Sequence, residues 1–163
     1  MRINSDFILS IPKTDLHLHL DGSLRILTLI DIAKKNKIKL PSFTESGLKE
    51  TVFKNSYNNL VEYLEGFKYT TAVMQDSESI ERIAYELAQD CIAENTCYIE
   101  VRYAPQLHVH KNLSMPEILK ATNKGLERAK KEFNNSEKVK SGERVPFEYG
   151  IIGCAMRMIG RDF

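Results

Sequence analysis

Three segments rich in β-forming residues are separated by long amphipathic segments along the 163 residues of the chain. The predicted strands and helices are, in chain order, 14–20, 24–36, 58–74, 77–91, 97–104, 114–133 and 147–156, with a polar loop at 134–146. Parallel strands need crossovers of this length, whereas antiparallel neighbours can be joined by a short hairpin. The order strand, helices, strand, helix, strand therefore predicts an α/β fold in which helices cover a parallel sheet. A doubly wound sheet and a closed barrel both fit this order.

The first predicted strand alternates between leucines and ionisable side chains. Its two faces consist of Leu16, Leu18 and Leu20 and of Asp15, His17, His19 and Asp21. Side chains two residues apart on a strand point to the same side, about 7 Å apart along it, so His17 and His19 can converge on one metal ion. Four ionisable groups on one buried face would be costly without a metal or other partners. The polar face is therefore a candidate site at the carboxyl end of a strand, where parallel α/β folds place their sites.

A second histidine pair shows that spacing alone does not identify a metal site. His108 and His110 have the same separation, but they follow Pro105 in a predicted loop without flanking alternation. We predict that both are surface residues.

Four motifs in the same order along the chain resemble the adenosine deaminases of the amidohydrolase superfamily. They are IPK-T-DLHLHLDGS at 11–23, LVEYLEGF at 60–67, YIEVRYAP at 98–105 and CAMR at 154–157. The resemblance implies a (β/α)8 barrel, of which this chain would contain about the first three strands and their helices. It implies one domain over 1–163, with a helical lid at about 43–74 and no second domain. A complete barrel of this kind needs about 250 residues.

The resemblance also implies roles for particular residues. His17 and His19 would be metal ligands, and the substrate-binding residues would be His19, Asp21, Leu60, Tyr63, Leu64, Phe67, Leu107 and Met156. Asp21 would accept a hydrogen bond from the ribose 5′-hydroxyl, and the apolar lid residues would exclude water. Many family members carry Phe where this chain has Tyr63. We interpret Glu100, Arg102 and Arg157 as structural hydrogen-bonding or ion-pairing residues.

The family reaction is the zinc-dependent hydrolytic deamination of adenosine or 2′-deoxyadenosine to inosine or 2′-deoxyinosine and ammonia, within purine nucleoside metabolism and salvage. Its third metal histidine and its proton-shuttling glutamate belong to a His-Ala-Gly-Glu motif that does not occur in the 163 residues, so no catalytic residue is predicted within the chain and the glutamate is expected beyond Phe163. Catalytic zinc usually has three protein ligands. We therefore expect weak or absent Zn2+ binding and no deaminase activity from this chain alone.

Composition restricts the partners that the chain is expected to have. The net charge is +1 without a basic stripe, which disfavours nucleic acid, and no apolar run approaches the length of about 18 residues that suggests a membrane span. The N-terminus has no apolar leader segment, and the three scattered cysteines are typical of free thiols, so we expect a cytoplasmic protein. The expected partner is a small purine nucleoside.

Three alternatives remain open at this stage. The first is another deaminase of the superfamily, acting on adenine, aminofutalosine or AMP, or a secreted growth-factor-like deaminase. The second is a non-catalytic protein that self-associates through uncovered barrel edges. The third is a compact metal-binding domain that uses His17, His19, His108 and His110 together.

Overall fold

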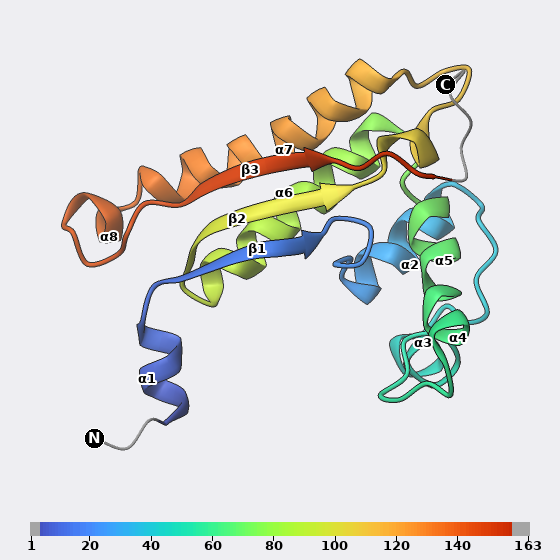
Figure 1. The fold of residues 1–163 in the computed structure, drawn as a ribbon, viewed down its shortest axis with the longest axis horizontal. Coiled ribbons are helices and arrows are strands. Elements are labelled where there is room, and N and C mark those ends of the chain that lie inside the picture. The colour runs from blue at the N-terminus through green and yellow to red at the C-terminus, as the bar shows by residue number, and fades with distance from the viewer. Residues whose placement is uncertain (1–3, 158–163) are drawn as a thin grey trace.

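A three-stranded parallel sheet forms the centre of the computed structural model, which describes residues 4–157 (Figure 1). Strands β1 (Lys13–His19), β2 (Thr96–Tyr103) and β3 (Glu148–Gly153) lie side by side in chain order. This order without a reversal is that of consecutive strands in a barrel, whereas the strand order of a doubly wound sheet reverses at a switch point. The three predicted strands are confirmed, and the outer ends of the predicted domain 1–163 lie outside the described residues.

Helices pack on one face of this sheet and form a separate group beyond its carboxyl end (Figure 1). Their bounds are α1 Ser5–Ser10, α2 Ile26–Lys35, α3 Glu45–Thr51, α4 Leu60–Leu64, α5 Gly66–Ala72, α6 Ser77–Ala93, the 3-10 helix η1 Pro105–His108, α7 Met115–Asn134 and α8 Glu137–Lys140. The helices α6 and α7 cover the sheet, and α3, α4 and α5 occupy the predicted lid segment. No helix among the described residues is long and apolar enough to cross a membrane.

The helix predicted at 58–74 is wrong as a single element. Glu65 ends α4 and begins α5, and its N–H donates to the Val61 carbonyl while its own carbonyl accepts from Lys68. The helices α1 and α8 were not predicted, and α8 lies in the expected loop, whereas α3 was expected only as part of the helical lid and without bounds of its own. These are short helices without apolar periodicity; α1 begins at the side-chain cap Asn4, and α3 at the cap Thr44.

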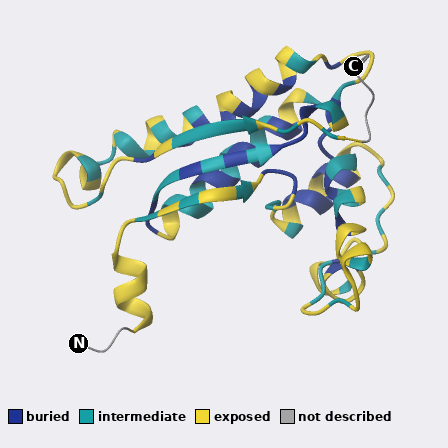
Figure 2. Cartoon of the chain, in the orientation of Figure 1, coloured by how far each residue is buried: buried dark blue, intermediate teal, exposed yellow. Residues whose placement is uncertain are grey.

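The core lies between β2 and the helices α6 and α7 (Figure 2). Ile99, Val101 and Tyr103 of β2 are buried on the helix side, and the Tyr103 hydroxyl hydrogen-bonds to that of Thr122 at 2.8 Å. The facing helices contribute buried Ile80, Ile83, Ala84, Leu87, Ala88, Ile118, Leu126 and Ala129, which confirms most of both predicted apolar stripes. The alternate β2 residues Tyr98, Glu100 and Arg102 are half-buried on the opposite side. We call this second side of the sheet the open face, because no described helix packs on it.

Close contact between α6 and α7 depends on Gly125. A Cβ atom at this position would lie 2.2 Å from the Glu81 carbonyl oxygen and 2.9 Å from the Ala84 Cβ. The neighbours are mainly helix backbone, which cannot move without separating the two helices.

We predict that Gly125→Ala destabilises the chain by about 1–3 kcal/mol, because the overpacking strain exceeds the roughly 1 kcal/mol that alanine gains in helix propensity. The free energy of unfolding, measured in urea, gives the test. Lys120→Ala on the exposed side of α7 is the matched control and should change stability by less than about 0.5 kcal/mol. An equal or greater stability of Gly125→Ala would show that the helices are not held this closely.

Candidate metal and substrate site

Strand β1 contains one more residue than β2 over the length of the candidate site. Asp15 pairs with Ile99 and Leu18 with Val101, so Leu16 and His17 have no direct partner on β2. This is a β-bulge, and it interrupts the alternation of faces. Asp15 therefore lies on the same helix-facing side of the sheet as Ile99. There it is close to Cys91, whose pKa is raised to about 12 first by burial, then by the charge of Glu94 and then by that of Asp15. The prediction that Asp15 extends the histidine face is wrong.

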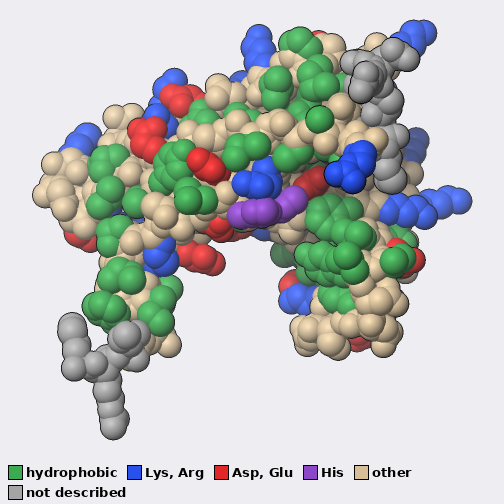
Figure 3. Space-filling view, viewed as in Figure 1, with side chains coloured by type: hydrophobic (Ala, Val, Ile, Leu, Met, Phe, Trp, Pro, Cys, Tyr) green, Lys and Arg blue, Asp and Glu red, His purple; other side chains and the backbone are tan. Residues whose placement is uncertain are grey.

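The bulge leaves His17 and His19 together on the open face. Their ring centroids are 5.3 Å apart with an interplanar angle of 36°, and both side chains are exposed. Figure 3 shows histidine at the surface of this face, between basic side chains and a group of hydrophobic ones. Two adjacent imidazoles are suitable ligands for zinc, which accepts histidine nitrogen. No cluster of three or more potential metal-ligating side chains occurs within 4–157, so the two histidines are not joined by a third ligand from the described residues.

Asp21 lies just beyond the end of β1, in a tight turn. The Ser23 hydroxyl donates to the His19 carbonyl at 2.6 Å, and the Leu20 N–H donates to the Arg102 carbonyl at 3.0 Å. The Asp21 side chain is buried, and its Oδ1 is 3.6 Å from the Nδ1 of His19, too far for a hydrogen bond. Burial raises the pKa of Asp21, and the charge of His19 opposes this rise. A buried carboxylate oxygen without a donor is a natural acceptor for a ligand hydroxyl.

Aromatic side chains of the lid reach the same place. The Phe67 ring lies 6.4 Å from the His19 ring and 6.2 Å from the Tyr63 ring, in edge-to-face arrangements. A small pocket of about 50 Å3 is lined by Asp21, Gly22, Phe53, Tyr57, Tyr63, Gly66, Phe67 and Thr70. A Cβ atom at Gly22 would lie 3.3 Å from the His19 Cβ, which is tight, and 3.5 Å from the Phe67 ring, which is an ordinary contact.

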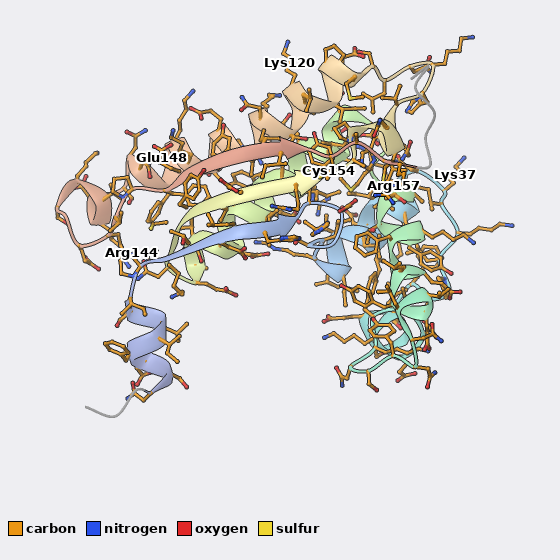
Figure 4. All side chains as sticks on the ribbon, viewed as in Figure 1. Lys37, Lys120, Arg144, Glu148, Cys154 and Arg157 are labelled. Carbon is orange, nitrogen blue, oxygen red and sulfur yellow. The ribbon has the colours of Figure 1, made fainter. Side chains whose placement is uncertain are left out.

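The other predicted substrate-binding residues, Leu60, Leu64, Leu107 and Met156, do not line this pocket. Leu60 and Leu64 are 68% and 49% exposed on α4 and do not line the pocket. Leu107 is exposed on η1, directly after β2, and its carbonyl accepts a hydrogen bond from Gln75 at 3.3 Å. The Met156 N–H donates to the Gln106 side chain at 3.1 Å, which ties the segment after β3 to η1. Figure 4 shows Cys154 and Arg157 at this same end of the sheet.

The second histidine pair does not belong to this site. His108 is fully buried beside Tyr103, with ring centroids 5.9 Å apart, and burial lowers its pKa to about 4. The prediction of a surface residue is therefore wrong for His108, because η1 turns its ring into the core. His110 is exposed as predicted, and its Nε2 lies 2.8 Å from the Gln75 carbonyl oxygen. The two pairs therefore do not form a four-histidine site.

Several residues of the site were missed or only partly described from the sequence. The small pocket beside Asp21 is also lined by Phe53, Tyr57 and Thr70. The sequence around Phe53 and Tyr57 has no periodic pattern that would have identified these two residues. Arg102 was predicted to be a hydrogen-bonding residue, and its Nη2 donates to the Leu16 carbonyl at 3.0 Å. Glu100 accepts a hydrogen bond from the Tyr98 hydroxyl at 3.3 Å. Only the local geometry shows that Arg102 reaches the bulge of β1.

Comparisons with known proteins agree with this arrangement. The family model described as adenosine deaminase matches residues 12–161. An adenosine deaminase from Clostridium botulinum (strain 657 / Type Ba4) is 47% identical over 156 residues, which are 93% of this chain and 47% of that protein. The chain thus spans about half the length of the curated relatives it matches.

Solved structures give the same architecture. An Arabidopsis N6-mAMP deaminase superimposes with a TM-score of 0.61 at 28% identity, over 76% of this chain and 36% of that one. An amidohydrolase from Burkholderia ambifaria with bound Zn gives a TM-score of 0.70 at 17% identity, over 94% of this chain and 39% of that one, and so shows the fold alone. The three strands and their helices are therefore part of a (β/α)8 barrel of the amidohydrolase kind. With a family match over nearly its whole length, the chain belongs to the adenosine deaminase family.

Proposed function

We propose that these residues form part of an enzyme that hydrolyses adenosine or 2′-deoxyadenosine to inosine or 2′-deoxyinosine and ammonia. The observation that carries the proposal is the proximity of His17, His19 and Asp21, with Phe67 of the lid beside His19. The buried Oδ1 of Asp21 has no hydrogen-bond donor among the described residues. Water supplies the oxygen that replaces the amine on the purine, so the reaction needs no oxidant or reductant.

His17 and His19 are proposed to hold a zinc ion together with ligands from outside this chain. Their rings are adjacent, exposed to the open face and on a strand whose backbone is hydrogen-bonded to β2. A bound zinc would supply Lewis acidity, which makes the attacking water a stronger nucleophile at neutral pH. The Burkholderia ambifaria amidohydrolase, which has the same fold, is a structure with bound Zn.

Asp21 is proposed to select a nucleoside over a nucleotide. Its buried Oδ1 has no donor within residues 4–157 and would accept a hydrogen bond from a ribose hydroxyl. The same carboxylate would repel a 5′-phosphate, because two anions in a poorly solvated pocket are unfavourable. Such repulsion would favour adenosine over AMP, although one structural relative is an N6-mAMP deaminase.

The lid is proposed to exclude water from the purine. Tyr63 and Phe67 already lie beside Asp21 and His19, and the exposed Leu60 and Leu64 would extend the same apolar cover. Leu107 and Met156, which follow β2 and β3, would contact the base from the other side. The free thiols of Cys91, Cys97 and Cys154 suit a cytoplasmic enzyme of purine nucleoside salvage.

A second candidate function is self-association without catalysis. Within the described residues, β1 and β3 each pair only with β2, so both have an unpaired outer edge that can pair with another chain. Light scattering distinguishes the two candidates, because a concentration-dependent oligomer without zinc would favour association and a monomer would count against it.

A chimera tests the proposed reaction most completely. We predict that a fusion of residues 1–163 to the second half of the Clostridium botulinum relative converts adenosine to inosine. Residues 1–163 alone should not do so, because His17 and His19 are two of the three protein ligands usual for catalytic zinc. The fall in ultraviolet absorbance of adenosine gives the rate, with AMP as the competing substrate. His17→Ala and His19→Ala should abolish turnover, and Lys120→Ala should not. Equal rates with AMP, or turnover by the 163 residues alone, would contradict the proposal.

The Asp21 carboxylate is expected to lower the stability of the folded chain while it strengthens substrate binding. Because burial raises its folded-state pKa, the ionised carboxylate costs stability at neutral pH, and this cost disappears as the pH falls through that pKa towards the unfolded value of 3.8. We predict that Asp21→Asn stabilises the 163-residue chain by about 1 kcal/mol at pH 7 and progressively less towards pH 4.

Urea unfolding at several pH values measures this difference. In the chimera, the same substitution should raise KM for adenosine, because an amide is a weaker acceptor than a carboxylate. A loss of stability at pH 7 would mean that Asp21 has a partner in the folded chain.

A further inference from the structure

Arg102 lies on the open face of β2, next to the metal-binding histidines of the proposed function. It pairs in register with His19 on β1, so the two side chains leave the sheet on the same side. Its Nη2 donates to the Leu16 carbonyl oxygen at 3.0 Å, across the gap between the strands. Its Nε is buried without an acceptor in the part of the chain that the structure describes, so the Leu16 carbonyl is the contact that orients the guanidinium.

The Leu16 carbonyl belongs to the peptide group that precedes His17. The N–H of the same peptide group donates to the Oδ1 of Asp15 at 2.9 Å. Both ends of the Leu16–His17 peptide are therefore bonded to side chains, at a bulge where neither residue has a direct partner on β2. A peptide group is planar, so fixing its oxygen and its N–H fixes the plane from which the His17 side chain leaves the backbone.

We propose that Arg102 is a positioning residue that, together with Asp15, holds the Leu16–His17 peptide so that the His17 ring faces the same ion as His19. Without this anchor, the bulge could rotate its peptide, and the two rings would no longer converge. The inference rests on the proposed function for its metal and on the described geometry for its mechanism. Side chains that orient metal ligands typically affect metal affinity by 10–100-fold.

The charge of Arg102 would act in the opposite direction. A guanidinium near a divalent cation repels it, so removal of the charge alone would tighten metal binding. The sign of the change in affinity therefore separates the two roles.

Zinc affinity of the 163-residue chain, measured by competition with a chromophoric chelator, tests the inference. We expect Arg102→Gln to weaken zinc binding by about 10–100-fold, and Arg102→Lys, which keeps a donor and the charge, to recover part of the loss. The matched control is Glu100→Gln, on the same face of the same strand but bonded to Tyr98 rather than to β1. Removal of this carboxylate takes away a charge that attracts the cation, so the control should weaken zinc binding slightly and much less than Arg102→Gln does. Unchanged or tighter binding by Arg102→Gln would overturn the inference.

A second measurement does not depend on the metal. In the zinc-free chain, NMR should show a nuclear Overhauser effect between the His17 and His19 rings, weakened in Arg102→Gln and retained in Glu100→Gln. If the unchanged chain binds no zinc, the metal claim of the proposed function fails, and this ring contact alone decides the role of Arg102. If Arg102→Gln does not fold, Asp15→Ala releases the other end of the same peptide and should weaken the same contact. A ring contact that survives both substitutions would overturn the inference.

Discussion

The packing of α6 and α7 on one face of the sheet determines where a site can form. Because Ile99, Val101 and Tyr103 of β2 are buried against these helices, the alternate residues must point to the open face. The strand β1 follows β2 in register at its carboxyl end, so His19 points to the open face beside Arg102. The position of the candidate site thus follows from which face of the sheet the helices cover, and the conformational preferences of the individual strand residues play a minor part.

The bulge in β1 changes the side of the sheet on which Asp15 lies. Regular alternation would place Asp15 on the open face, whereas the extra residue sends it to the helix side and leaves its carboxylate free to bind the His17 N–H. The histidine pair is consequently held by its own strand and by β2. Asp21 and Phe67 then border the pair from the turn and the lid, which brings a polar acceptor and an apolar cover to the same place.

Much of this arrangement could be predicted from the sequence. The helices α6 and α7 follow from the helical spacing of their apolar residues, and α7 also from the capping box at its start. The strands β2 and β3 follow from runs of β-forming and apolar residues, and β1 from its alternation. The position of Asp15 could not be predicted, since a bulge depends on the pairing with β2 and leaves no period in one strand. The burial of His108 could not be predicted either, because it results from the turn of η1 against Tyr103 and from no local pattern. The roles of His17, His19 and Asp21 come from a family resemblance, and the structure adds their proximity.

The central claim is that the imidazoles of His17 and His19 bind one zinc ion together. X-ray absorption spectroscopy of the 163-residue chain loaded with zinc measures this directly. We expect a spectrum fitted by two imidazole nitrogens at about 2.0–2.1 Å, with the remaining positions filled by oxygen ligands such as water. A spectrum without imidazole scattering, or one that is unchanged when both histidines are replaced by alanine, would contradict it.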